Sequence, residues 1–117
     1  MNRCLVAVTL AGGMALAAHA ASPAPGATVP AGQAVYEHWC APCHSAGRGN
    51  PGTESLQVKY AGKTPAVLLD RRDLTPQAVA AFVRAGVLSM PPFRKTEITD
   101  AELAALSAYV AAGPARR

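Results

Sequence analysis

Cysteine is scarce in this chain. Three of the 117 residues are cysteines, and Cys4 lies in an apolar run at the N-terminus, which leaves Cys40 and Cys43 as a close pair. A structural zinc site usually takes four Cys or His ligands, often from two separated pairs. Beyond residue 20 the candidates are this pair, His38 and His44, all crowded into one short stretch. The scarcity therefore argues against a zinc-stabilised fold.

Charge is also sparse and not strongly of one sign. Charged residues make up 15% of the sequence, with 11 basic and 7 acidic side chains and a net charge of +4. Without Arg3, ten basic and seven acidic residues leave +3. The basic residues are scattered, so nucleic acid is not an expected partner. The mild excess is enough to steer an acidic protein partner.

Long apolar runs are missing except at the N-terminus. Arg3 is followed by an apolar run over residues 4–18 and by Ala18-His19-Ala20, an Ala-x-Ala cleavage site. This pattern predicts a signal peptide over residues 1–20 and an exported, periplasmic protein. The run is short for a bilayer span, so a retained anchor is the alternative. No membrane span is expected in the mature chain.

Strand-like alternation and internal repeats are absent, which predicts an all-α fold. Residues 21–30 are uncharged and rich in Ala, Pro, Ser and Gly, which predicts a flexible leader. Residues 31–113 are expected to form one domain, and residues 114–117 a frayed tail. So short a chain has a modest core of its own, and a large apolar cofactor would fill it.

Helix start and stop signals divide this domain. Thr64-Pro65, Thr75-Pro76 and the capping box that begins at Thr99 predict helix starts, and Gly86 and Gly113 predict helix ends. The expected helices cover residues 32–44, 66–70, 76–86 and 99–113, and a loop covers residues 45–53. The apolar residues expected on the buried faces of the last two helices are Val79, Phe82, Val83, Leu103, Leu106 and Val110.

One run of residues carries specific chemistry. Cys40-Ala41-Pro42-Cys43-His44 is a C-x-x-C-H motif, whose two thiols suit covalent attachment to the two vinyl groups of one haem. His44 follows directly, so a short helical turn would bring its ring under the iron as the proximal ligand. A thioredoxin-type pair is disfavoured because no βαβ pattern surrounds the motif. A disulfide between Cys40 and Cys43 is the other chemical alternative.

A second ligand is predicted at Met90, the only methionine beyond residue 20. A lone methionine usually fills a core. Here Pro91 pushes Met90 towards an extended conformation, and the Pro91-Pro92 pair stiffens the loop that would present its sulfur. His38, the competing ligand, would point away from the far side of the haem in a helical segment. A histidine–methionine site has both axial positions filled, which favours electron exchange over binding of oxygen or substrate.

Two neighbouring segments also bear on this site. A ligating imidazole usually donates its other N–H to a carbonyl group, and the backbone around Asn50 or Pro51 is the expected acceptor. Arg71, Arg72 and Asp73 are expected to form a solvated corner between two helices. An arginine that reaches a haem propionate or a partner is the alternative.

Residues 32–112 resemble a small class I cytochrome c. Gly32 and Tyr36 are similar to the glycine and aromatic pair on the N-terminal helix of that family. Leu106 and Tyr109 resemble their partners on its C-terminal helix. The resemblance implies that the N- and C-terminal helices cross beside one covalently attached haem c.

A closer resemblance is to the cytochrome subunits of flavocytochrome hydroxylases that oxidise p-cresol and related 4-alkylphenols. It rests on residues 36–44, 50–53 and 90–98, and Met90 matches the sixth ligand of the family. The resemblance implies that the chain accepts electrons from a covalent-flavin dehydrogenase subunit, in a heterotetramer, and passes them to another periplasmic carrier. It implies no catalytic residue and no substrate binding in this chain.

Two other functions are compatible with parts of the sequence. A c-haem peroxidase or small-ligand sensor would need an open or labile sixth position, but only one haem motif is present and no obvious distal acid–base set accompanies it. A free electron shuttle for another dehydrogenase would keep the haem and change only the partner. Trp39 is expected in the core, whereas Arg94 and Lys95 either belong to a docking surface or are simply solvated.

Overall fold

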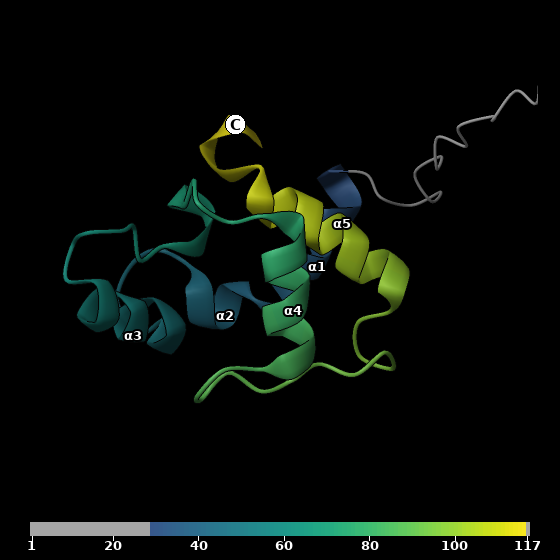
Figure 1. Ribbon diagram of the computed structural model, residues 1–117, viewed down its shortest axis with the longest axis horizontal. Coiled ribbons are helices and arrows are strands. Elements are labelled where there is room, and N and C mark those ends of the chain that lie inside the picture. The colour runs from purple at the N-terminus through teal and green to yellow at the C-terminus, as the bar shows by residue number, and fades with distance from the viewer. Residues whose placement is uncertain (1–28, 117) are drawn as a thin grey trace, which may run out of the picture.

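The computed structural model describes residues 29–116, so the predicted signal peptide and most of the predicted leader lie outside it. This part of the chain forms helices and no strand, which confirms the all-α prediction (Figure 1). None of its helices has the length and apolar character needed to cross a membrane. The elements are α1 (Val29–Trp39), α2 (Ala41–His44), α3 (Pro51–Tyr60), η1 (Leu68–Asp70), α4 (Pro76–Ala85), α5 (Asp100–Ala111) and η2 (Gly113–Arg116).

The first and last long helices, α1 and α5, cross in close contact (Figure 1). Gly32 lies at the crossing, where a Cβ atom would collide with the carbonyl oxygen of Ala105 and lie 2.7 Å from Cβ of Tyr109. Only glycine allows two backbones to approach so closely. One turn later, the rings of Tyr36 and Tyr109 pack with their centroids 5.8 Å apart. The crossing of the N- and C-terminal helices that the resemblance implies is therefore present.

The core lies where α1 and α4 pack on α5. Its fully buried side chains are Ile98, Leu106 and Val110. Val79 and Val83 lie four residues apart on α4 and face this core, as predicted. The prediction that Phe82 is buried is wrong, because its side chain is 48% exposed. A residue adjacent to Val83 points to a different side of the helix, and Phe82 faces the cavity described below.

Side-chain caps and a glycine fix the ends of α4 and α5 as predicted. Thr75 Oγ1 accepts a hydrogen bond of 3.1 Å from an amide of the first turn of α4. Thr99 and Glu102 form both hydrogen bonds of a capping box at the start of α5. Gly86 ends α4 with a φ of +68°, and a Cβ atom there would lie 2.7 Å from the carbonyl oxygen of Met90.

The helix predicted over residues 32–44 is longer at its start and interrupted near its end. It begins at Val29, two residues inside the predicted leader, and α1 gives way to α2 at Cys40. Trp39, the last residue of α1, is half-buried and packs against the core, with its ring edge-on to Phe93 and the centroids 5.7 Å apart. This is the core position expected for Trp39.

The loop predicted over residues 45–53 ends early, because α3 begins at Pro51. Proline is favoured at the first helical position, because the N–H group that it lacks would have no intrahelical acceptor there. The apolar residues of α3 do not define one buried face, since Val58 is 84% exposed while Leu56 is half-buried. Without an apolar stripe, this segment has no helical periodicity to detect.

Two short 3₁₀ elements complete the described chain. The short helix predicted over residues 66–70 is present only in part, as the 3₁₀ turn η1. The start predicted at Thr64-Pro65 is wrong, because η1 begins at Leu68 after Val67 and has no side-chain cap. Residues 114–117 were expected to fray, but Gly113–Arg116 forms η2, which packs against η1. Gly113 has a φ of +55°, and a Cβ atom there would lie 2.5 Å from the carbonyl oxygen of Arg71. The C-terminal residues therefore pack against the backbone of Arg71 and against η1 instead of extending into solvent.

The corner between η1 and α4 is solvated at Asp73 as predicted, but not at Arg71. Arg71 is buried, and its guanidinium donates two hydrogen bonds to the carboxylate of Asp73 and one of 3.0 Å to the hydroxyl of Tyr60. The guanidinium also lies over the Tyr60 ring, 4.8 Å from its centroid. Arg72 is exposed, as expected. The carboxylate of Asp73, in the corner itself, neutralises the charge of the buried Arg71. The hydroxyl of Tyr60, at the end of α3, accepts a third hydrogen bond from the guanidinium.

Replacing Gly32 by alanine should destabilise the fold by about 1–3 kcal/mol, because the new methyl group would force α1 and α5 apart. Urea unfolding measures this change in the free energy of unfolding. Ser55→Ala, at an exposed position of α3, is the control and should change stability by less than about 0.5 kcal/mol. Equal stabilities of the two variants would contradict the proposed crossing geometry.

Asp73→Asn should remove one source of acid sensitivity. The hydrogen bonds from Arg71 hold the pKa of Asp73 below its ordinary value of 3.8. The carboxylate therefore stabilises the fold fully above that value, and the contribution is lost as the pH falls through the lower folded-state pKa. Thermal unfolding should show Asp73→Asn less stable than wild type at neutral pH, with the difference shrinking as the pH falls below about 4. Arg72→Gln, the control, should follow the wild type at every pH.

Candidate functional site

The C-x-x-C-H motif forms a tight turn at the end of α1. The amide of Cys40 donates to the carbonyl oxygen of Tyr36 at 2.9 Å, and the amide of His44 donates to that of Cys40 at 2.9 Å. Cys40 is buried and Cys43 is exposed, and the two thiols are free rather than joined in a disulfide. Burial, followed by the neighbouring Cys43, raises the pKa of Cys40 to about 11. Cys40 is therefore a neutral thiol near pH 7.

His44 is half-buried at the end of α2. The hydroxyl of Tyr36 donates to its carbonyl oxygen at 3.1 Å, which ties the motif back to α1. Burial lowers the pKa of the imidazole below its ordinary value of 6.5, because the charged form is poorly solvated there. The ring is thus neutral at pH 7, the state in which histidine binds metals.

The expected acceptor for His44 around Asn50 or Pro51 is not present. Nδ1 of His44 is buried without a hydrogen-bond partner. The first turn of α3 lies against the ring instead, and Gly52 is the residue in contact with it. The contact at this point is between the imidazole and the helix backbone.

Met90 closes a tight turn that follows α4. The amide of Val87 donates to the carbonyl oxygen of Met90 at 3.0 Å, and the amide of Met90 donates back at 2.9 Å. Leu88, in the middle of this turn, has a φ of +52°, which is uncommon for a residue with a side chain. Its side chain is 96% exposed, whereas Met90 is half-buried and packs against the core. The turn therefore directs the two side chains to different environments.

His44 and Met90 line the same cavity, which has a volume of about 180 Å³. Cys40 is also in its wall, whereas His38 is exposed and packs edge-on against Trp39. The structure thus brings together the two predicted iron ligands and one of the two predicted haem cysteines, and it leaves out the competing histidine. The other residues in the wall are Leu56, Lys59, Tyr60, Leu68, Arg71, Leu74, Val79, Phe82, Val83, Val87, Leu106 and Val110.

The chemistry of this wall fits a haem. Most of it is aliphatic or aromatic, as a large apolar ring requires, and it offers an imidazole and a thioether as iron ligands. Lys59 supplies a cation that suits the acidic substituents of a haem, whereas the charge of Arg71 is already paired with Asp73. Cys43 is exposed and lies outside the wall, three residues from Cys40 on the same turn.

Sequence reasoning missed the part of the wall that α3 and the corner at Arg71 supply. Leu56, Lys59 and Tyr60 come from α3, a helix that the sequence did not predict. Leu68 and Leu74 flank the corner around Arg71, and no motif marks them. The one available signal was Phe82, because an aromatic residue next to the buried stripe of a helix needs a partner of its own.

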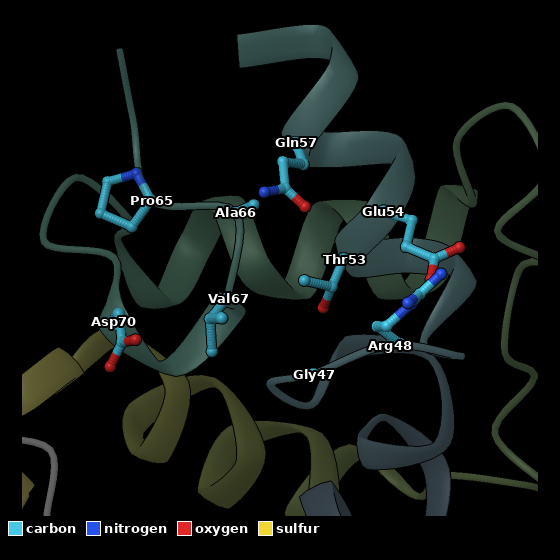
Figure 2. Close-up of a pocket in the computed structure, with 9 residues that line it drawn as sticks. All are labelled: Gly47, Arg48, Thr53, Glu54, Gln57, Pro65, Ala66, Val67 and Asp70. Carbon is cyan, nitrogen blue, oxygen red and sulfur yellow. The ribbon is translucent and has the colours of Figure 1, made fainter. Parts of the chain in front are cut away.

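A second, larger hollow of about 490 Å³ lies on the other side of α3 and contains none of the predicted site residues (Figure 2). Its walls come from α3, from the loop after α2 and from the segment that leads into η1. Arg48, Glu54 and Asp70 give it charges of both signs. This mixture does not select one class of ligand.

The chain matches a protein-family model over residues 27–110, which is most of its length. The family is described as cytochrome c oxidase, cbb3-type, subunit III. The comparisons with curated proteins and with solved structures gave no significant match.

The match includes the C-x-x-C-H motif, Met90 and both crossing helices, so it covers the whole wall of the cavity. An electron-transfer haem protein is the function that this family match supports, and haem c is the cofactor that it implies. The residues of the cavity fit that cofactor independently of the match. The chain therefore belongs to this cytochrome c family and is an electron-transfer haem protein.

Proposed function

We propose that this chain is a periplasmic cytochrome that takes single electrons from a flavoprotein subunit oxidising 4-alkylphenols. The observation that carries the proposal is that His44 and Met90 line one apolar cavity with Cys40 in its wall. One haem c would be attached through Cys40 and Cys43, with His44 and Met90 as its axial ligands. The signal-peptide pattern of residues 1–20 supports export.

The ligand pair determines what kind of chemistry this site supports. A bound haem supplies reversible one-electron exchange at its iron. His44 offers a neutral imidazole, and Met90 offers a thioether that favours the reduced state. With both side chains as ligands, no position is left for oxygen or a small substrate. The apolar wall excludes water, and this supports electron transfer rather than catalysis at the iron.

The mouth of the cavity offers a surface for a protein partner. Phe82 and Val87 line the cavity and are still 48% and 43% exposed, and Leu88 is 96% exposed beside them. Exposed apolar side chains gathered at one place indicate a contact site for another protein. A partner that binds here would cover the cavity and approach the site of electron exchange.

The segment over residues 90–98, which is part of the resemblance to 4-alkylphenol flavocytochromes, is held by hydrogen bonds next to this mouth. Lys95 donates to the carboxylate of Asp100 at 2.7 Å, and the amide of Arg94 donates to the carboxylate of Glu97 at 2.8 Å. Both basic side chains still keep most of their surface exposed. They could contribute polar contacts to the flavoprotein partner in the heterotetramer that the resemblance implies. The electron would then pass from the haem to a downstream periplasmic carrier.

Met90→Ala should change both the spectrum and the potential of the haem protein. Loss of the thioether should abolish the iron–sulfur charge-transfer band of the ferric form and lower the midpoint potential. The reduced variant should bind carbon monoxide rapidly, whereas the reduced wild type resists it. Leu88→Ala, in the same turn but outside the cavity, is the control and should behave as wild type. An unchanged ferric spectrum and potential in Met90→Ala would overturn the ligand assignment.

Co-expression with a flavoprotein 4-alkylphenol dehydrogenase tests the partner. The two chains should co-purify, and addition of a 4-alkylphenol should reduce the haem. Leu88→Asp should weaken this association because it places a charge in the apolar contact, whereas Val58→Asp, at an exposed apolar position on α3, should not. A cytochrome that purifies alone and stays oxidised with the phenol present would instead identify a free shuttle for another dehydrogenase.

A further inference from the structure

The first turn of α3 lies directly against the imidazole of His44. A Cβ atom on Gly52 would lie 2.7 Å from Cε1 and 2.9 Å from Nδ1 of this ring. It would also lie 2.8 Å from the carbonyl oxygen of Cys43. Contacts below 3.0 Å are essentially never seen for real Cβ atoms. The ring and the backbone of the C-x-x-C-H motif therefore occupy the space that a side chain at position 52 would need.

The backbone conformation of Gly52 does not require glycine. Gly47 and Gly49 have positive φ values, but Gly52 is not among the residues that do. It lies in the first turn of α3, and a helical backbone favours alanine over glycine. The close contact with His44 is thus the feature of the structure that demands a residue without a side chain.

Two hydrogen bonds hold the surfaces that meet at Gly52. Oγ1 of the buried Thr53 donates to the carbonyl oxygen of Ser45 at 2.9 Å, which ties the first turn of α3 to the residue after His44. The hydroxyl of Tyr36 donates to the carbonyl oxygen of His44 at 3.1 Å. The motif is therefore held between α1 and α3, with the imidazole against Gly52.

The orientation of the imidazole depends on this packing. A ligating histidine is usually oriented by a hydrogen bond from its second ring nitrogen. Nδ1 of His44 is buried and has no such partner. The backbone of Gly52 packs against the Cε1 and Nδ1 side of the ring and so limits the rotation of the imidazole.

We propose that Gly52 is a positioning residue for His44, because its missing side chain lets α3 close on the imidazole and fix the plane of the ring. This inference rests on the proposed function, since it takes His44 as the axial iron ligand. The ring plane of an axial histidine affects the electronic structure of a low-spin ferric haem, so a change in orientation is observable by electron paramagnetic resonance.

Gly52→Ala in the full-length exported haem protein provides the main test. The methyl group should displace the ring and shift the g values of the ferric protein, together with the midpoint potential. Gly62→Ala is the matched control, because its φ of +80° strains any side chain while a Cβ atom there meets nothing within 4 Å. It should lower the unfolding temperature and leave the g values unchanged. Wild-type g values and potential in Gly52→Ala would overturn the proposal.

A milder pair of variants decides the case in which Gly52→Ala does not accumulate. Thr53→Val keeps the shape of the side chain and removes the hydroxyl that ties α3 to Ser45. It should shift the g values in part, because the turn that carries Gly52 is released. Thr53→Ser keeps the donor and should restore the wild-type values. Identical g values in both Thr53 variants and the wild type would overturn the proposal.

The wild-type spectrum separates failure of this inference from failure of the proposed function. A low-spin histidine–methionine spectrum in the wild type, with unaltered Gly52→Ala and Thr53→Val variants, would overturn the role of Gly52 alone. A wild-type protein without histidine ligation would overturn both the role of Gly52 and the proposed ligand pair.

Discussion

The crossing of α1 and α5 at Gly32 is the contact on which the rest of the structure depends. The missing side chain lets the two helices touch, and this contact brings the rings of Tyr36 and Tyr109 together. Tyr36 in turn holds the carbonyl oxygen of His44. On the other helix, Leu106 belongs both to the core and to the wall of the cavity. One helix contact therefore sets the core and the position of the predicted iron ligand.

The cavity is assembled from segments that are far apart in the sequence. The motif supplies one side, α3 and the corner at Arg71 supply another, and α4 with the turn at Met90 supplies the third. Apolar side chains such as Phe82 and Val87 are left partly exposed by the protein alone. A small domain buries a limited fraction of its surface, and a bound haem would fill the cavity behind these side chains and complete the core.

The sequence predicted the elements that have strong local signals and missed those that depend on contacts. The caps at Thr75 and Thr99 were readable because their hydrogen bonds are made within one turn. The helix α3 was missed because it lacks an apolar stripe, and η2 was missed because its order comes from contact with η1. Arg71 was expected in solvent, since its partner Tyr60 lies eleven residues away and only the fold brings the two together.

By itself, the sequence determined the all-α class, the C-x-x-C-H motif with its adjacent histidine, and Met90 as a second candidate ligand. These conclusions follow from residue types and short spacings, which are local properties of the chain. Only the tertiary structure decided that His44 and Met90 share one cavity, that His38 lies outside it, and that Gly52 packs against the imidazole. The reason is physical. The distances between these residues are set by the crossing of α1 and α5 and by the packing of α3, and the spacing of residues along the chain does not encode them.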